Sequence, residues 1–372
     1  MLNEQTAFGV IINIVLIIFL LLLLNRYHRG NVVCKQQFAL LGIFLFCLFS
    51  FWGRDWYGYL HYTDIFRKGY GQISMEPFYV WLLSLIEGNY FLFRSIVWGG
   101  AIVFFYKTIK RTELNINLVL YLFCGIYLIF FSYARATLCM AVIFFGYSLL
   151  YSHRKKYNQL AILIGISIIF AAFYLHKSSI FGIGAALISA IIMKRENKIF
   201  SSLLLLTPVI IFLLYYYFSS SGIAFSESST FADYTQAGNV YLAANMNYKG
   251  IGAMISTFLE RLPYYLVSIL CFLEIRQKKR AIPRIVGSFL VMLIVIVFLS
   301  TFFLIDFGVN TTTLYGRFLR FGQIPACIAL AYFYQNNLYA KFVDRIIFIA
   351  FISTFYSLMY VTYNLIMQNK II

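Results

Sequence analysis

Long uncharged apolar runs are the feature that most limits how this chain can fold. Residues 285–305, for example, contain no charged side chain. A helix of that length rises about 30 Å, which matches the hydrocarbon core of a bilayer. The whole chain is 62% hydrophobic and only 12% charged, whereas soluble domains average roughly 25% charged residues. The sequence therefore predicts an integral membrane protein without a large domain outside the bilayer.

About twelve apolar runs have the length of a membrane-spanning helix. They cover residues 7–24, 38–52, 90–106, 115–132, 136–151, 158–175, 178–193, 199–218, 257–274, 285–305, 321–336 and 346–364. We therefore expect an all-α polytopic membrane protein, with a single integral membrane domain over residues 1–372. The first run lacks a basic start and a small-residue cleavage site, so it is expected to remain as a helix.

Basic residues gather in alternate connections between these runs. One side of the membrane then holds 19 of the 30 basic residues and 4 of the 13 acidic ones. The basic residues on that side are Arg26, Arg29, Lys35, Lys107, Lys110, Arg111, Arg154, Lys155, Lys156, Lys194, Arg195, Lys198, Arg276, Lys278, Lys279, Arg280, Arg284, Lys341 and Arg345. An excess of Lys and Arg marks cytoplasmic loops, so both termini are expected on the opposite face, the periplasm in a bacterial cell. Topology thus accounts for most of the net charge of +17, and no nucleic-acid partner is expected.

Three expected outer segments carry both signs of charge, unlike the short basic cytoplasmic loops. They are a loop at 53–76, a large loop at 219–255 and the segment 306–320. Residues 77–87 are apolar but too short to cross, so they are expected to lie in the interface or to re-enter the membrane. An active site, if there is one, is expected on this outer, periplasmic face.

Two carboxylates lie at the expected outer boundary. Glu76 precedes Pro77, where it could cap a helix or accept a proton from an incoming hydroxyl. Asp55 follows Arg54, and it could pair with an arginine or serve as the base. The residue types leave both interpretations open at each position.

Cationic residues at the same boundary come from distant parts of the chain. Arg135 occupies a four-residue break between apolar runs, and His176 lies in a second break with two serines. Arg317 and Arg320 are three residues apart, so on a helix they share a face and could hold one anion together. Each arginine could instead extend toward lipid headgroups. Arg94 and Arg261, near outer helix ends, have the same two interpretations.

Arginines gathered at one face are suited to a lipid-linked phosphate or diphosphate. A guanidinium stays charged and offers forked donors to phosphate oxygens, so it can stabilise a departing diphosphate without a metal. The sequence has no metal-ligand pattern and no glycine-rich nucleotide loop, so neither a metal nor a cofactor is expected. Aromatic residues at 56, 57, 59 and 62 could stack on sugars, although interfacial belts are the commoner explanation.

Four short motifs resemble those of the Wzy-type polysaccharide polymerases, particularly the EpsG-like branch. They are RDWYGYLHYTD followed by EPFY at residues 76–79, SYARATLCMA around Arg135, YLHKSSI around His176 and YGRFLRF around Arg317 and Arg320. They fall within residues 50–190 and 310–325. Phe78 stands where that family often has a small residue, and Ala136 where it often has Gln.

The resemblance implies an inverting glycosyltransferase of GT-C-like architecture in the bacterial inner membrane. It would join oligosaccharide repeat units carried on undecaprenyl diphosphate, and so extend O-antigen, capsule or exopolysaccharide. Donor and acceptor would both be lipid-linked, and a polysaccharide chain-length regulator is a candidate partner. In this scheme Glu76 or Asp55 is the base, and His176 positions the diphosphate or the acceptor. The diphosphate would be bound by Arg135, Arg317, Arg320, Arg54 and Arg261.

Three other classes share part of this pattern. An O-antigen ligase uses the same donor, a lipid-linked oligosaccharide flippase needs cationic surfaces around a diphosphate, and a membrane acyltransferase carries a buried histidine. A flippase would be expected to carry charges deep within its helices. The middles of these runs are almost free of charge, which favours a single outer site.

Overall fold

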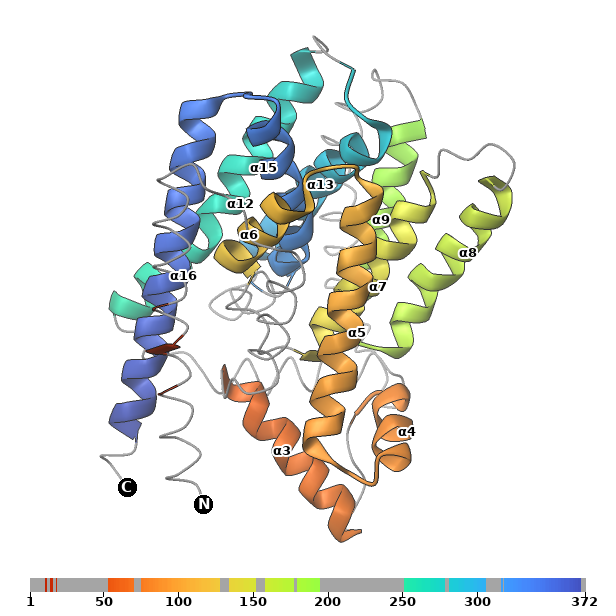
Figure 1. The fold of residues 1–372 in the computed structure, drawn as a ribbon, viewed down its shortest axis with the longest axis vertical. Coiled ribbons are helices and arrows are strands. Elements are labelled where there is room, and N and C mark those ends of the chain that lie inside the picture. The colour runs from red at the N-terminus through yellow and green to blue at the C-terminus, as the bar shows by residue number, and fades with distance from the viewer. Residues whose placement is uncertain are drawn as a thin grey trace, which may run out of the picture.

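The computed structural model describes most of the chain between residues 53 and 368 (Figure 1). The described ranges are 53–69, 75–127, 134–151, 158–176, 179–194, 251–277, 281–305, 316 and 318–368, with Ile11, Ile14, Val15 and Ile18. The side chains of residues 53–58 and 251–258 are not described. Within these ranges every regular element is a helix, as the sequence predicts.

The helices follow one another with short connections where those are described. They are α3 (Gly53–Lys68), α4 (Pro77–Leu85), α5 (Tyr90–Arg111), α6 (Ile116–Tyr127), α7 (Ala134–Leu149), α8 (Asn158–Ala171), α9 (Ser179–Lys194), α12 (Ile251–Gln277), α13 (Arg284–Ile305), α15 (Gln323–Gln335) and α16 (Ala340–Gln368), with the 3₁₀ turns η3 (Ala172–Tyr174) and η5 (Arg320–Gly322). Nine of the apolar runs each fall on one of these helices, and most boundaries agree within a few residues. The expected spans 38–52 and 199–218, most of the expected span 7–24 and most of the expected loop 219–255 lie outside the described residues.

Helices α13 and α15 form the centre of the bundle. Residues Ile285–Val297 of α13 and all residues from Gln323 to Phe333 of α15 are buried. A helix that is apolar on every side is buried in a protein core or spans a membrane. In this protein α9, α12 and α15 pack on α13, while α6 and α16 pack on α15.

Residues 53–68 of the expected outer loop at 53–76 form a helix, α3. This helix is polar on average, and it was not recognised because its sequence lacks a continuous apolar stretch. Tyr59 and Thr63, one turn apart, are its buried residues, whereas Asp64 and Lys68 are exposed and form an ion pair. The buried positions therefore attach α3 to the bundle along one side.

The short apolar segment forms α4, a helix of nine residues. At 1.5 Å per residue it rises about 14 Å, roughly half of the hydrocarbon thickness. Pro77 begins the helix, where a missing N–H costs nothing. The following helix, α5, begins with a side-chain cap in which Asn89 accepts a hydrogen bond from the N–H of Leu92 at 3.1 Å.

The described helices have two distinct ends (Figure 1). The carboxyl ends of α9 and α12 and the start of α16 lie at the top of the view, whereas α3, α4 and the start of α5 lie at the bottom. The carboxyl end of α12 and the start of α16, which adjoin connections assigned to the basic side, therefore lie at the opposite end from α4. This separation agrees with the alternation of basic connections along the sequence.

Length and composition qualify two of the described helices as membrane spans, Tyr90–Arg111 and Arg284–Thr301. Three shorter helices, α7, α8 and α9, are also strongly apolar. These apolar helices support a membrane-embedded protein. The expected count of about twelve spans and the GT-C-like architecture remain predictions.

Helices α7 and α8 cross closely at a pair of glycines. A Cβ atom added to Gly146 would lie 2.8 Å from the carbonyl oxygen of Gly165, and one added to Gly165 would lie 2.7 Å from that of Gly146. Small residues let helix backbones approach in a membrane, where packing drives association. Because the obstructing atoms belong to the backbone, a larger residue requires the helices to move apart.

Replacing Gly146 or Gly165 with Ala is expected to destabilise the fold by about 1–3 kcal/mol through this overpacking. The measurement is the unfolding midpoint of purified protein in detergent. Gly184→Ala is the matched control, because no described atom lies within 4 Å of the position that its Cβ would take. Equal midpoints for all three variants would contradict the close crossing.

Candidate functional site

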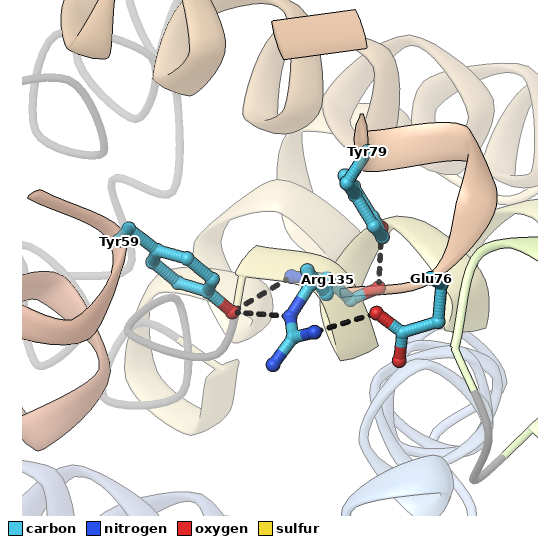
Figure 2. Close-up of polar contacts among 4 residues, drawn as sticks. All are labelled: Tyr59, Glu76, Tyr79 and Arg135. Carbon is cyan, nitrogen blue, oxygen red and sulfur yellow. Dashed lines mark hydrogen bonds and ion pairs between the residues drawn. The ribbon is translucent and has the colours of Figure 1, made fainter. Parts of the chain in front are cut away.

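Arg135, in the first turn of α7, is held by side chains from two other helices (Figure 2). Its Nη1 donates to Oε2 of Glu76 at 2.5 Å, and its Nε donates to the hydroxyl oxygen of Tyr59 at 3.3 Å. The side chain of Arg135 is 21% exposed and that of Glu76 is 8% exposed. A nearly buried charge is costly unless it is paired, so each residue stabilises the other in this position.

The Glu76–Pro77 sequence sets the direction of the carboxylate. A residue before proline favours an extended backbone, and Glu76 has φ −63° and ψ 148° as the cap residue of α4. Its side chain makes no capping hydrogen bond to the helix. The helix-capping interpretation of this carboxylate was therefore wrong, since the side chain binds Arg135 instead.

Tyr79 fixes the backbone at the same place. Its hydroxyl donates to the carbonyl oxygen of Arg135 at 3.3 Å, and its ring is fully buried against Phe93. Burial raises the pKa of Tyr79 well above its ordinary value, so the hydroxyl stays protonated as a donor. The rings of Tyr59 and Tyr79 also lie 5.5 and 6.0 Å from the guanidinium carbon, within the range of cation–π attraction.

The guanidinium keeps donors for a ligand after these contacts. Arginine has five N–H donors, and the Nε and one Nη1 hydrogen of Arg135 are used. Within the described residues Nη2 has no partner, and Figure 2 shows it pointing away from Tyr59 and Glu76. A fixed guanidinium with an unoccupied edge can bind two oxygens of a phosphate group.

His176 lies in the break between η3 and α9, and it is partly buried. Its carbonyl oxygen accepts a hydrogen bond from the N–H of Ser179 at 2.9 Å. The preceding turn packs against α7, since Sγ of Cys139 lies 3.8 Å from the carbonyl oxygen of Ala172. Cys139 is one turn after Arg135, so these contacts bring the break to the same part of the bundle as Arg135.

Arg320 belongs to a second arginine–carboxylate pair. Its Nε lies 3.7 Å from Oε1 of Glu260, with the side chains 17% and 20% exposed. Arg261, the neighbour of Glu260, lies so close to Gly316 that a Cβ there would be 3.1 Å from Nη2 of the arginine. Two neighbouring residues of α12 therefore contact this segment: Glu260 lies beside Arg320, and Arg261 lies beside Gly316.

This segment also contacts the start of α9. The rings of Phe181 and Phe318 stack with centroids 4.3 Å apart. The side chains of Phe321 and Ile143 fill the space beside Gly182, where a Cβ would have no room. Helix α9 is thus packed between α7, which carries Arg135, and the turn that carries Arg320.

Three of the predicted site residues cannot be compared with the prediction. Arg317 lies outside the described residues, and the side chains of Arg54 and Asp55 are not described. Both of the latter residues belong to α3, near its amino end. Asp55 lies one helical turn before Tyr59, which contacts Arg135.

Sequence reasoning missed the partners of the arginines. Glu260 was not singled out, although an acidic residue beside an arginine within an apolar run was a visible signal. Tyr59 was assigned to sugar stacking or to an interfacial belt, whereas it is 3% exposed and binds Arg135. Arg94 was expected to reach a headgroup or a ligand, but it is 1% exposed and lies over the ring of Trp98.

The fold and this site define a class: a membrane-embedded helical protein with arginine–carboxylate pairs at one end of its bundle. The EpsG family model matches residues 37–371 of the chain. The protein therefore belongs to the EpsG family, a family of Wzy-type polymerase-like proteins. No curated protein and no solved structure matched the chain.

A double-mutant cycle on Glu76→Ala and Arg135→Ala is expected to give a coupling of about 1–3 kcal/mol, because each single change leaves the other charge nearly buried without its partner. The measurement is the free energy of unfolding in mixed micelles with SDS. The control is the same cycle on Asp64 and Lys68, an exposed pair at 2.7 Å that should show no measurable coupling. Additive effects at Glu76 and Arg135 would contradict the pairing.

Proposed function

We propose that this protein is an inverting polysaccharide polymerase that works at the periplasmic face of the bacterial inner membrane. It would join oligosaccharide repeat units that are carried on undecaprenyl diphosphate. The observation that carries the proposal is the Arg135 guanidinium, which Glu76, Tyr59 and Tyr79 hold at one end of the bundle with Nη2 unoccupied. Membership in the EpsG family supports the same class of reaction.

In the proposed reaction a sugar hydroxyl of the acceptor attacks the anomeric carbon of the donor. The new carbon–oxygen bond forms as the bond to the diphosphate breaks, and the base takes the hydroxyl proton. Undecaprenyl diphosphate leaves with the electron pair, and a single displacement inverts the anomeric centre. Donors that are fixed before the reaction stabilise the charge that develops on the leaving oxygen, which is the role proposed for Arg135.

Glu76 and Asp55 are the two candidates for the base. Glu76 is close to the guanidinium, but its Oε2 already accepts a hydrogen bond from Arg135. Asp55, one turn from Tyr59 on α3, is the other candidate.

The remaining cations would complete the diphosphate site. Arg320 and Arg261 lie on the segment around η5 and on α12, and Arg317 and Arg54 are proposed as further ligands from the sequence. The loose 3.7 Å contact with Glu260 leaves Arg320 able to exchange its carboxylate for a phosphate. His176 would position the diphosphate or the acceptor. A chain-length regulator remains a proposed partner.

Arg135→Ala and Arg135→Lys are both expected to abolish polymer, because a lysine cannot be fixed by Tyr59 and Glu76 while also presenting a planar pair of donors. The test is a gel of surface glycan from cells that lack the gene and carry each variant, with protein amounts matched by immunoblot. Lys68→Ala, an exposed cation on α3, is the control and should restore full polymer.

The glycan that accumulates in cells without the gene distinguishes the alternatives. A polymerase defect leaves surface glycan with a single repeat unit. Lipid-linked units held inside the cell would indicate a flippase, and long polymer left on undecaprenyl diphosphate would indicate an O-antigen ligase. Full-length polymer from both Arg135 variants would remove this residue from the site.

Exchanging each carboxylate for its amide separates the base from a positioning residue. Glu76→Gln keeps an oxygen that can accept from Arg135, so we expect reduced polymer if it only positions the arginine. Asp55→Asn is then expected to lower the rate of polymerisation by at least about 100-fold, in the range of a lost general base. The measurement is the initial rate with purified protein and lipid-linked repeat units, and the opposite ranking would assign the base to Glu76.

A further inference from the structure

A cavity of about 410 Å³ lies between α3 and the connection from α4 to α5. Its lining residues are Leu60, Arg67, Ile86, Glu87, Asn89, Tyr90 and Phe91. The volume falls in the usual range for small-ligand sites. The cavity is separate from the contacts of Arg135, but α3 carries residues of both places.

Opposite charges face this cavity without neutralising each other. Arg67 and Glu87 both line it, and within the described residues neither side chain forms a hydrogen bond or an ion pair. The Asn89 amide uses its oxygen to cap α5, so its N–H₂ group remains as a donor. The cavity thus offers an acceptor, several donors and the rings of Tyr90 and Phe91.

The walls of the cavity are fixed in place. Glu87 has φ 50°, a left-handed conformation at the end of α4, where the N–H of Gly88 donates to the carbonyl oxygen of Leu83 at 2.9 Å. Gly88, at φ 66°, packs against α3 so closely that a Cβ would lie 2.6 Å from Cγ of Arg67. The hydroxyl of Tyr90 accepts from Nη1 of the buried Arg94 at 3.1 Å. The site is therefore already formed without a ligand.

From its volume, its opposite charges and its aromatic lining we infer that the cavity binds a sugar of the repeat unit other than the reacting one, which makes it a specificity site of the proposed polymerase. Sugars present hydroxyls that bridge acidic and basic side chains, together with C–H faces that pack on aromatic rings. Tyr59 and Arg67 are eight residues apart on α3, or about 12 Å along the helix. That separation is longer than one sugar ring, so a neighbouring sugar of the same substrate reaches the cavity. The inference rests on the proposed function for its substrate class.

Two measurements on the full chain in nanodiscs test this site. The first is saturation-transfer NMR with the free oligosaccharide, released by mild acid from the lipid-linked repeat unit that accumulates without the gene. The second is the kinetics of polymerisation with the intact lipid-linked unit. Glu87→Gln and Arg67→Ala are expected to remove the saturation transfer and to raise KM about tenfold, with kcat unchanged.

The chain offers a matched control for each variant. Glu113→Gln alters another exposed glutamate with positive φ, 59°, at the end of α5, away from the cavity. Lys68→Ala removes the cation next to Arg67, which does not line the cavity. Phe91→Ala gives a second cavity variant without a change of charge, and it too should weaken the saturation transfer.

The outcomes separate the cavity from the reaction. Unchanged saturation transfer and KM in the three cavity variants overturn the inference, even if Arg135→Ala abolishes polymer and so supports the reaction. Saturation transfer to a short-chain phosphatidylglycerol in place of the oligosaccharide also overturns it. Loss of saturation transfer in the cavity variants supports the sugar site, even where Arg135→Ala leaves polymerisation intact and the proposed reaction fails.

Discussion

The ion pair between Arg135 and Glu76 joins α7 to the start of α4. Holding a charged side chain in an apolar bundle costs free energy, and the groups around this pair offset that cost. Neither residue could be nearly buried alone. Tyr59 adds α3 to the same contact, and Tyr79 fixes the backbone of the arginine. Three helices are therefore held at one point by polar contacts, while packing determines the rest of their interfaces.

The two arginine–carboxylate pairs differ in the distance between nitrogen and oxygen. Nη1 of Arg135 is in direct hydrogen-bond contact with Oε2 of Glu76, whereas Nε of Arg320 lies 3.7 Å from Oε1 of Glu260. A short pair fixes the direction of a guanidinium, and a longer one leaves its donors exchangeable. The proposed site thus combines one arginine of defined orientation with another that can change partner.

Much of the architecture could be predicted because membrane helices depend on local sequence. Backbone polar groups in lipid must be satisfied within the helix itself, so an uncharged run such as 285–305 predicts α13 almost without reference to the rest of the chain. Helix α3 escaped this reasoning. Among its described side chains, the buried Tyr59 and Thr63 stand one turn apart between exposed or half-buried residues, and packing against the bundle decides that they form a helix.

The sequence by itself determined an all-helical protein with apolar, membrane-like helices and the grouping of its basic connections, and it singled out Arg135, Glu76 and Arg320 as candidate site residues. Only the tertiary structure decided that Glu76 binds Arg135, that Glu260 accompanies Arg320 and that Tyr59 is a structural ligand of the arginine. The reason is that helix formation follows from nearest neighbours along the chain. The polar contacts of Arg135 with Glu76 and Tyr59 instead depend on which helices meet in space, across separations of 59 and 76 residues.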